Sequence, residues 1–179
     1  MKRRLVRIII GVCVVVPLVV TSCMMNESED YPDFNEQLEK DLTAIDNYLA
    51  ANNITAQSDP DGFIRYVIHK DSVDGKRPTI DSCVTANYRG MLLSNGQEFD
   101  KGTNISFPLN GVIDGWKIGI PLLNVGDSAT LYIPSGLGYG FYGFEPEIPA
   151  NANLIFNVAV KKVGTTYRAP TSTTAGSCN

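Results

Sequence analysis

The most informative segment of the chain is Ile133-Pro134-Ser135-Gly136-Leu137-Gly138-Tyr139-Gly140. It belongs to an alternating stretch, residues 128–134, that has the period of a half-buried strand. The glycines look superficially like a phosphate-binding loop, but no helical pattern opens after them and no lysine follows at the required spacing. We therefore interpret the segment as a strand that runs into a tight, irregular loop, which glycine permits.

Further alternating segments lie on both sides of this loop. Residues 63–70, 83–93 and 154–163 have the two-residue period of strands, and Ser94-Asn95-Gly96 is typical of a hairpin turn. Residues 114–120 could form a short helix. Several short strands and one small helix predict an α+β domain whose antiparallel sheet is covered on one side.

A different pattern precedes the strands. Apolar side chains recur at helical spacing and predict an amphipathic helix from about residue 34 to residue 51. They are Leu38, Leu42, Ile45 and Leu49. Asp33, with Glu36 three residues later, fits an N-terminal capping box. A helix with such a stripe needs an apolar partner, which is either its own domain or a second copy of the chain in a homodimer.

The first 22 residues resemble the signal peptide of a Gram-negative bacterial lipoprotein. Four basic residues precede an apolar run, residues 8–20, that is too short to span a bilayer at about 20 residues. Val20-Thr21-Ser22-Cys23 resembles a lipobox, in which the cysteine is acylated after cleavage. Met24 after this cysteine favours forwarding to the outer membrane. An ordinary signal peptide and a single signal anchor are the alternatives.

Charge and composition divide the rest of the chain. Acidic residues dominate positions 23–33, which we interpret as a tether, and residues 34–58 hold the helix and a turn. A compact domain follows over residues 59–164, and residues 165–179 form a polar tail that we expect to be disordered. The whole chain has 15 basic and 19 acidic residues, so no basic surface predicts a nucleic-acid partner.

The usual catalytic constellations are absent from the sequence. One histidine and four scattered cysteines are too few for a zinc or haem site, so we predict no cofactor. His69 is interpreted as an ordinary strand residue. Cys83 and Cys178 could form a disulfide in an oxidising compartment, but the position of Cys178 in the tail disfavours it. What remains is a set of aromatic and aliphatic residues, Phe107 among them, that could converge around Asp100.

Six motifs in a fixed order give the strongest signal. They are Ala86-Asn87-Tyr88-Arg89-Gly90, Asn95-Gly96-Gln97-Glu98-Phe99-Asp100, Val112-Ile113-Asp114-Gly115-Trp116, Val125-Gly126-Asp127, Ile133 to Gly140, and Ile148-Pro149-Ala150-Asn151-Ala152-Asn153-Leu154-Ile155-Phe156. In this order the chain resembles an FKBP-type peptidyl-prolyl cis-trans isomerase over about residues 79–163. The resemblance implies a half-open antiparallel sheet wrapped around a short helix, with Trp116 as the floor of a pocket. By the same resemblance, the pocket is lined by Tyr88, Phe99, Asp100, Val112, Ile113, Tyr139, Ile148 and Phe156.

The resemblance also implies a function. An enzyme of this family would bind proline-containing polypeptides and assist the folding of exported proteins, with no covalent intermediate. Two alternatives remain open: a non-catalytic proline-binding module or chaperone, and a domain that only supports the amphipathic helix. Ile105 stands where the family has an aromatic residue, and Glu147 stands where an aliphatic one is common. These departures concern rate and substrate preference rather than the fold.

Overall fold

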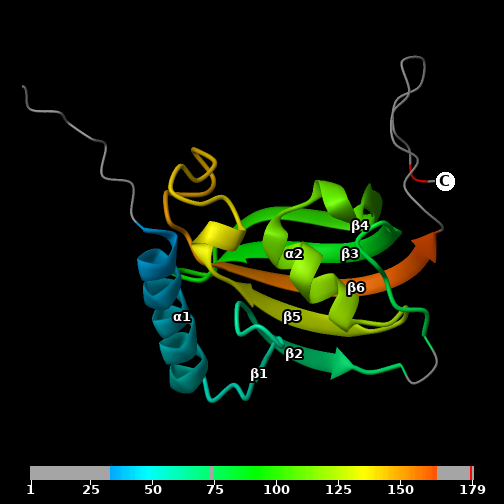
Figure 1. Cartoon of the computed structure of the whole chain (residues 1–179), viewed down its shortest axis with the longest axis horizontal. Coiled ribbons are helices and arrows are strands. Elements are labelled where there is room, and N and C mark those ends of the chain that lie inside the picture. Colours follow the sequence, from blue (N-terminus) through cyan, green and yellow to red (C-terminus); the bar gives the residue numbers. More distant parts are fainter. Residues whose placement is uncertain (1–32, 73–74, 165–177, 179) are drawn as a thin grey trace, which may run out of the picture. The chain divides into compact units, whose positions relative to one another are not determined.

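The computed structural model of the chain describes residues 33–72, 75–164 and 178. The predicted signal peptide, Cys23 and almost all of the predicted tether and tail lie outside these residues. Within the described part, six strands form one sheet in the order β1-β2-β5-β6-β3-β4, and all neighbouring strands are antiparallel (Figure 1). The strands are β1 (Gln57–Ser58), β2 (Arg65–Lys70), β3 (Cys83–Leu92), β4 (Glu98–Pro108), β5 (Ser128–Ile133) and β6 (Leu154–Gly164).

Two helices and three short 3₁₀ turns complete the described structure. The helices are α1 (Phe34–Ala51) and α2 (Asp114–Gly119), and the turns are η1 (Leu109–Gly111), η2 (Ile120–Leu122) and η3 (Ser135–Leu137). The order and pairing of these elements confirm the predicted fold, an antiparallel sheet with a short helix across it and a further helix before it. In the described part of the chain, none of the helices has both the length and the apolar character needed to cross a membrane.

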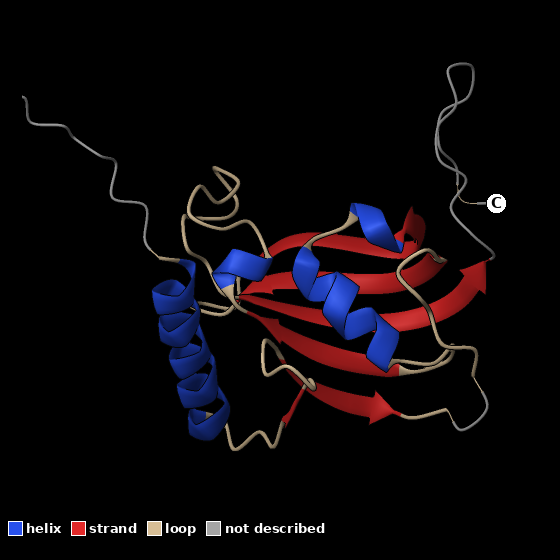
Figure 2. Ribbon diagram, in the orientation of Figure 1, coloured by secondary structure: helices blue, strands red, loops and turns tan. Residues whose placement is uncertain are grey.

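Helix α2 lies across one face of the sheet (Figure 2) and closes the main hydrophobic core. Its glycines allow this close contact. A Cβ atom on Gly115 would lie 2.4 Å from the side chain of Ile133, and one on Gly119 would lie 2.7 Å from that of Leu131. Both distances are shorter than carbon atoms tolerate, so glycine at these two positions lets α2 pack directly on β5.

Helix α1 packs on the opposite face, and the prediction of a sheet covered on one side is therefore wrong. Ile45 and Leu49 form a second buried cluster with Tyr132, Ile155 and Leu93. Tyr132 and Ile155 alternate along their strands with residues of the main core, so they point to the other side of the sheet. Strand β5 and the first residues of β6 are consequently buried on both faces, whereas Asn157 and Lys161, farther along β6 on the α1 side, stay exposed.

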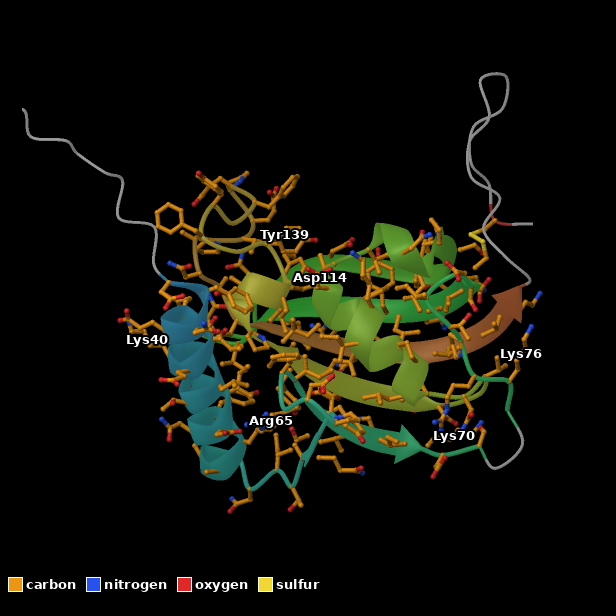
Figure 3. The ribbon with its side chains drawn as sticks, in the orientation of Figure 1. Lys40, Arg65, Lys70, Lys76, Asp114 and Tyr139 are labelled. Carbon is orange, nitrogen blue, oxygen red and sulfur yellow. A yellow bond between two sulfur atoms is a disulfide. The ribbon has the colours of Figure 1, made fainter. Side chains whose placement is uncertain are left out.

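The contacts of α1 show that its own domain, one of the two predicted partners, packs against its apolar stripe. Apart from the cluster around Ile45, Arg65 on β2, labelled in Figure 3, binds the Asp46 carboxylate through two nitrogens at 2.9 and 3.0 Å. At the start of the helix, Asp33 accepts a hydrogen bond from the backbone nitrogen of Asn35, as an N-cap does. Glu36 instead pairs with Lys40. A homodimer through the same helix stays a prediction.

Strand β4 has no counterpart among the predicted strands. Its pairing with β3 shifts register between Ala86 and Tyr88 and again between Gly90 and Met91. Asn104, in the middle of β4, has a φ of 54°, which a regular strand does not contain. These irregularities interrupt the two-residue period, so the sequence pattern does not indicate a strand.

Cys83 and Cys178 form a disulfide, with their Cα atoms 5.3 Å apart, so the expectation that the tail position disfavours this pair is wrong. The reason lies in the strand pairing. Cys83 is the first residue of β3 and is paired with Gly164, the last residue of β6. The chain therefore leaves β6 next to Cys83, the partner of Cys178.

Replacing Ile45 by alanine tests the docking of α1. Ile45 is fully buried, so we expect Ile45→Ala to lower the free energy of unfolding by about 2–4 kcal/mol, the cost typical of such a cavity. Urea denaturation of residues 24–179, followed by tryptophan fluorescence, measures this loss. Leu42→Ala is the control because Leu42 is only half-buried and lies outside the cluster. Equal losses in the two variants would contradict the described packing.

Candidate functional site

A cavity of about 310 Å³ opens between α2, the β3–β4 pair and the loop after η3. Its wall is mostly apolar, and Asp100 is the one carboxylate in it. The lining residues are Tyr88, Asp100, Ile105, Phe107, Gly111, Val112, Ile113, Trp116, Tyr139 and Phe156. Figure 3 labels Tyr139, which lies at the base of the loop that follows η3, and Asp114, which lies at the start of α2. The arrangement therefore offers an apolar ligand a concave surface with few polar groups.

Trp116 is packed against three other rings. Its ring centre lies 5.2 Å from those of Tyr88 and Phe156, both at steep edge-to-face angles, and 5.1 Å from that of Phe107. Edge-to-face contacts of this kind are more favourable than their buried area alone suggests. The side chain is 5% exposed, and its indole nitrogen has no hydrogen-bond partner within the described part of the chain. The rings thus hold the indole rigidly as one wall of the cavity.

Gly90 on β3 makes room for the aromatic rings next to this wall. A Cβ atom at this position would lie 2.7 Å from the rings of both Phe99 and Phe156. The two rings contact each other edge to face, with their centres 5.5 Å apart. Any larger residue at position 90 would displace Phe156, which lines the cavity.

The hydroxyl of Tyr88 holds the only carboxylate of the cavity. Tyr88 Oη donates a hydrogen bond to Asp100 Oδ2 at 2.9 Å. Burial, followed by this hydrogen bond, raises the pKa of Tyr88 to about 12. Burial and the nearby Asp100 also raise the pKa of Tyr139. Both tyrosines are therefore neutral near pH 7 and keep a hydroxyl proton that they can donate.

Seven of the nine residues predicted for the pocket line this one cavity. The other two, Phe99 and Ile148, line an adjoining cavity of about 320 Å³ together with Asp100, Tyr139, Phe144 and Glu147. Phe99 still supports the first cavity through its ring contact with Phe156. Asp100 and Tyr139 belong to both cavities, so the two spaces are neighbours along one surface.

Three lining residues lie outside the nine predicted for the pocket, and they are Ile105, Phe107 and Gly111. Of these, Phe107 was expected only to belong to the set of residues that converge around Asp100. Ile105 lies two positions before Phe107 on β4, and residues two apart on a strand share a face. The alternation of Ile105 and Phe107 could therefore have placed both on the cavity side. Gly111 ends η1, and the sequence around it carries no pattern that distinguishes it from other turn glycines.

His69 takes no part in the cavity. It lies near the end of β2, where its Nε2 is 2.7 Å from Thr130 Oγ1 on β5. Within the described residues, no group of three or more histidine, cysteine, aspartate or glutamate side chains could hold a metal ion.

Comparison with known proteins identifies the family. A model of the FKBP-type peptidyl-prolyl cis-trans isomerases matches residues 75–161. The chain is 44% identical over 97 residues to FK506-binding protein 1 of Candida glabrata, half of this chain and 84% of that protein. The chain therefore belongs to the FKBP-type peptidyl-prolyl isomerase family.

Bacterial relatives share a longer stretch of the chain. It is 42% identical over 111 residues to the probable FKBP-type isomerase FkpA of Neisseria meningitidis, which is 60% of this chain and 40% of that protein. A crystal structure of a peptidyl-prolyl isomerase from Pseudomonas syringae superposes with a TM-score of 0.61 at 27% identity, covering 70% of this chain and 94% of that one. FkpA of Escherichia coli gives a TM-score of 0.59 at 30% identity, covering 72% and 63%.

The raised pKa of Tyr88 gives a pH-dependent prediction. A tyrosine whose folded pKa exceeds the unfolded value of about 10 stabilises the fold fully below pH 10, and this contribution is lost as the pH rises towards 12. Urea denaturation at pH 8, 10 and 11 measures it. The difference in stability between the wild type and Tyr88→Phe should shrink as the pH rises. A difference that stays constant from pH 8 to pH 11 would contradict the assignment.

Proposed function

We propose that this chain is a peptidyl-prolyl cis-trans isomerase whose active site is the cavity lined by Trp116. The main support for this proposal is the cavity itself. In it, an indole held by three rings faces apolar side chains and a single carboxylate, Asp100. Membership of the FKBP-type family supports the same activity. The substrate class is a polypeptide segment that contains an X-Pro bond.

The reaction needs no nucleophile, base or metal. Rotation about a peptide bond crosses a barrier of about 18–20 kcal/mol because twisting removes the amide resonance. An X-Pro bond therefore takes tens to hundreds of seconds to isomerise unaided. Water stabilises the polar planar amide more than the twisted one, so transfer into an apolar cavity lowers the difference between them. A reduction of about 4 kcal/mol would accelerate rotation roughly a thousandfold.

The residues around the cavity divide into apolar and polar roles. Trp116, Val112 and Phe156 hold the proline ring, whose apolar body suits an indole surface. The backbone amide of Ile113, just before α2, binds a neighbouring carbonyl of the substrate. A hydrogen bond to the oxygen of the twisting amide would favour the planar form, so we assign Tyr139 to another carbonyl, where it positions the chain. Asp100, oriented by Tyr88, accepts a donor from the substrate.

We further propose that the isomerase acts on exported proteins in the cell envelope. The support is the lipobox-like sequence ending in Cys23, which precedes the described residues. Acyl chains on this cysteine would anchor the domain, since each buried methylene contributes about 0.8 kcal/mol. Forwarding to the outer membrane follows from Met24 at the next position. A non-catalytic module that binds proline segments is the second candidate, because the same cavity would serve it.

A proline-peptide isomerisation assay on residues 24–179 tests the activity. We expect Asp100→Leu to lower kcat/KM by about 10-fold to 100-fold, because a hydrogen bond to a charged group contributes about 1.5–3 kcal/mol. Asp100 is exposed, so this change should leave the fold intact. Asp81→Leu is the matched control, since it removes an exposed carboxylate from a turn outside the cavity.

Two controls check the assay, and binding measured beside turnover in the wild type distinguishes the two candidate functions. Asp81→Leu and His69→Ala should both keep the wild-type rate. A folded wild type that binds proline peptides, seen as a saturable change in Trp116 fluorescence, without any rate above the uncatalysed one would refute the enzyme and leave the binding module. A folded wild type that neither binds nor isomerises proline peptides would contradict both candidate functions of the cavity.

Metabolic labelling with a fatty acid tests the anchor. The whole chain, expressed in a Gram-negative host, should incorporate the label, and Cys23→Ala should not, because acylation requires the thiol. Cys13→Ala is the control, since this cysteine lies within the predicted signal peptide. Equal labelling of the wild type and Cys23→Ala would end the lipoprotein proposal.

A further inference from the structure

Helix α1 carries a buried carboxylate that takes no part in the apolar packing of the helix. Asp41 is 3% exposed and lies on the face of α1 that meets η3. Its Oδ2 accepts hydrogen bonds from the Ser135 backbone nitrogen at 2.9 Å and from Ser135 Oγ at 2.5 Å. Its Oδ1 accepts a third from Gln37 Nε2 at 2.8 Å. None of the ion pairs in the described residues includes Asp41.

Ser135 is in turn the centre of the loop that carries Tyr139. Its carbonyl oxygen accepts hydrogen bonds from the backbone nitrogens of Gly138 at 2.9 Å and Gly140 at 2.8 Å. These two residues flank Tyr139 on both sides. A continuous series of hydrogen bonds therefore runs from the Asp41 carboxylate through Ser135 to the backbone on either side of a residue that lines the cavity.

A second contact joins the same two elements. A Cβ atom on Gly136 would lie 2.9 Å from the ring of Phe34, so the first residue of α1 rests against η3. Figure 1 shows η3 beside the N-terminal end of α1, where β5 ends. The start of α1 and the start of the Tyr139 loop thus form one packed unit.

Docking of the helix does not require the carboxylate. Ile45 and Leu49 already bury the apolar stripe of α1 against the sheet. Burying a carboxylate is costly unless it is hydrogen-bonded, and an apolar residue of similar size often stabilises a fold as well or better. The directional bonds of Asp41 to Ser135 therefore point to a role in fixing the loop rather than in holding the helix.

We propose that Asp41 is a positioning residue that fixes the loop carrying Tyr139, so that α1 controls the geometry of the cavity. Asp41 acts through Ser135 and does not touch the substrate. The expected effect of Asp41 on kcat/KM rests on the proposed function. The fixing of the loop is a property of the folded chain and can be measured without turnover.

A double-mutant cycle on the whole chain, purified in detergent, tests the proposal. Asp41→Asn keeps the size of the side chain and removes an acceptor oxygen, and we expect kcat/KM for a proline peptide to fall about tenfold. In the Tyr139→Phe background, Asp41→Asn should change kcat/KM by less than about twofold, because a residue that acts through Tyr139 has no further effect once the hydroxyl is absent.

Ile45→Val is the matched control. It removes one methyl group from the same helix, one turn further on, and leaves the bonds to Ser135 intact. We expect its kcat/KM to stay within about twofold of the wild type at 10 °C, whatever its melting temperature. Ser135→Ala is the second test variant, because it removes only the hydroxyl and keeps the backbone donor. It should lower kcat/KM in the same direction as Asp41→Asn but by less.

Amide hydrogen exchange, followed by NMR, gives a readout that is independent of turnover. The Gly138 and Gly140 amides should exchange at least about tenfold faster in Asp41→Asn than in Ile45→Val. Unchanged exchange, or additive effects of Asp41→Asn and Tyr139→Phe, would overturn the proposal. If the wild type turned over no peptide, the proposed function would fail, and the exchange rates alone would decide whether Asp41 fixes the loop.

Discussion

The direct contact of α2 with β5 is the constraint on which the cavity depends. Because position 115 carries no side chain, the helix approaches Ile133 more closely than two ordinary side chains would allow. The next residue, Trp116, is thereby lowered into the space between Tyr88, Phe107 and Phe156. A helix held farther from the sheet would carry the indole out of this space and into the cavity. The depth of the site is therefore set by the absence of one methyl group.

The middle of the sheet couples the two sides of the domain. On β5, Leu131 and Ile133 belong to the core beneath α2, while Tyr132 between them belongs to the cluster beneath α1. One layer of backbone thus separates the main core beneath α2 from the cluster beneath α1. The two sides meet directly at the end of β5, where the chain turns through η3 towards Tyr139. A helix that precedes the six ordered motifs in the chain is in this way part of the structure around the site.

Local signals allowed part of this structure to be predicted from the sequence. The bounds of α1 follow from its apolar stripe and from Asp33, which are signals within a few residues of each other. The pocket residues followed from the family resemblance and its ordered motifs, and most of them do meet in one cavity. Strand β4 was missed because its bulges break the alternation on which strand prediction relies.

Other features depend on pairings between distant segments, which no local pattern contains. The disulfide requires β3 and β6 to be neighbours, so that Cys83 faces the point where the chain leaves the sheet. In the sequence, nothing distinguishes Asp41 from the other polar residues beside the apolar stripe of the amphipathic helix. Its partner Ser135 is 94 residues away, and only the packed fold brings the two together.

The disulfide also determines how the domain responds to force. Strands β4, β5 and β6, helix α2 and every residue that lines the cavity lie between Cys83 and Cys178, whereas α1, β1 and β2 lie before Cys83. When the chain is pulled, the sulfur–sulfur bond carries the force from Cys83 directly to Cys178. The segment between these two cysteines, which are 95 positions apart in the sequence, therefore does not bear the force. The mechanically extensible part of the domain is therefore its N-terminal third. The segment that builds the cavity is a covalently closed ring that a pull on the chain ends cannot unravel.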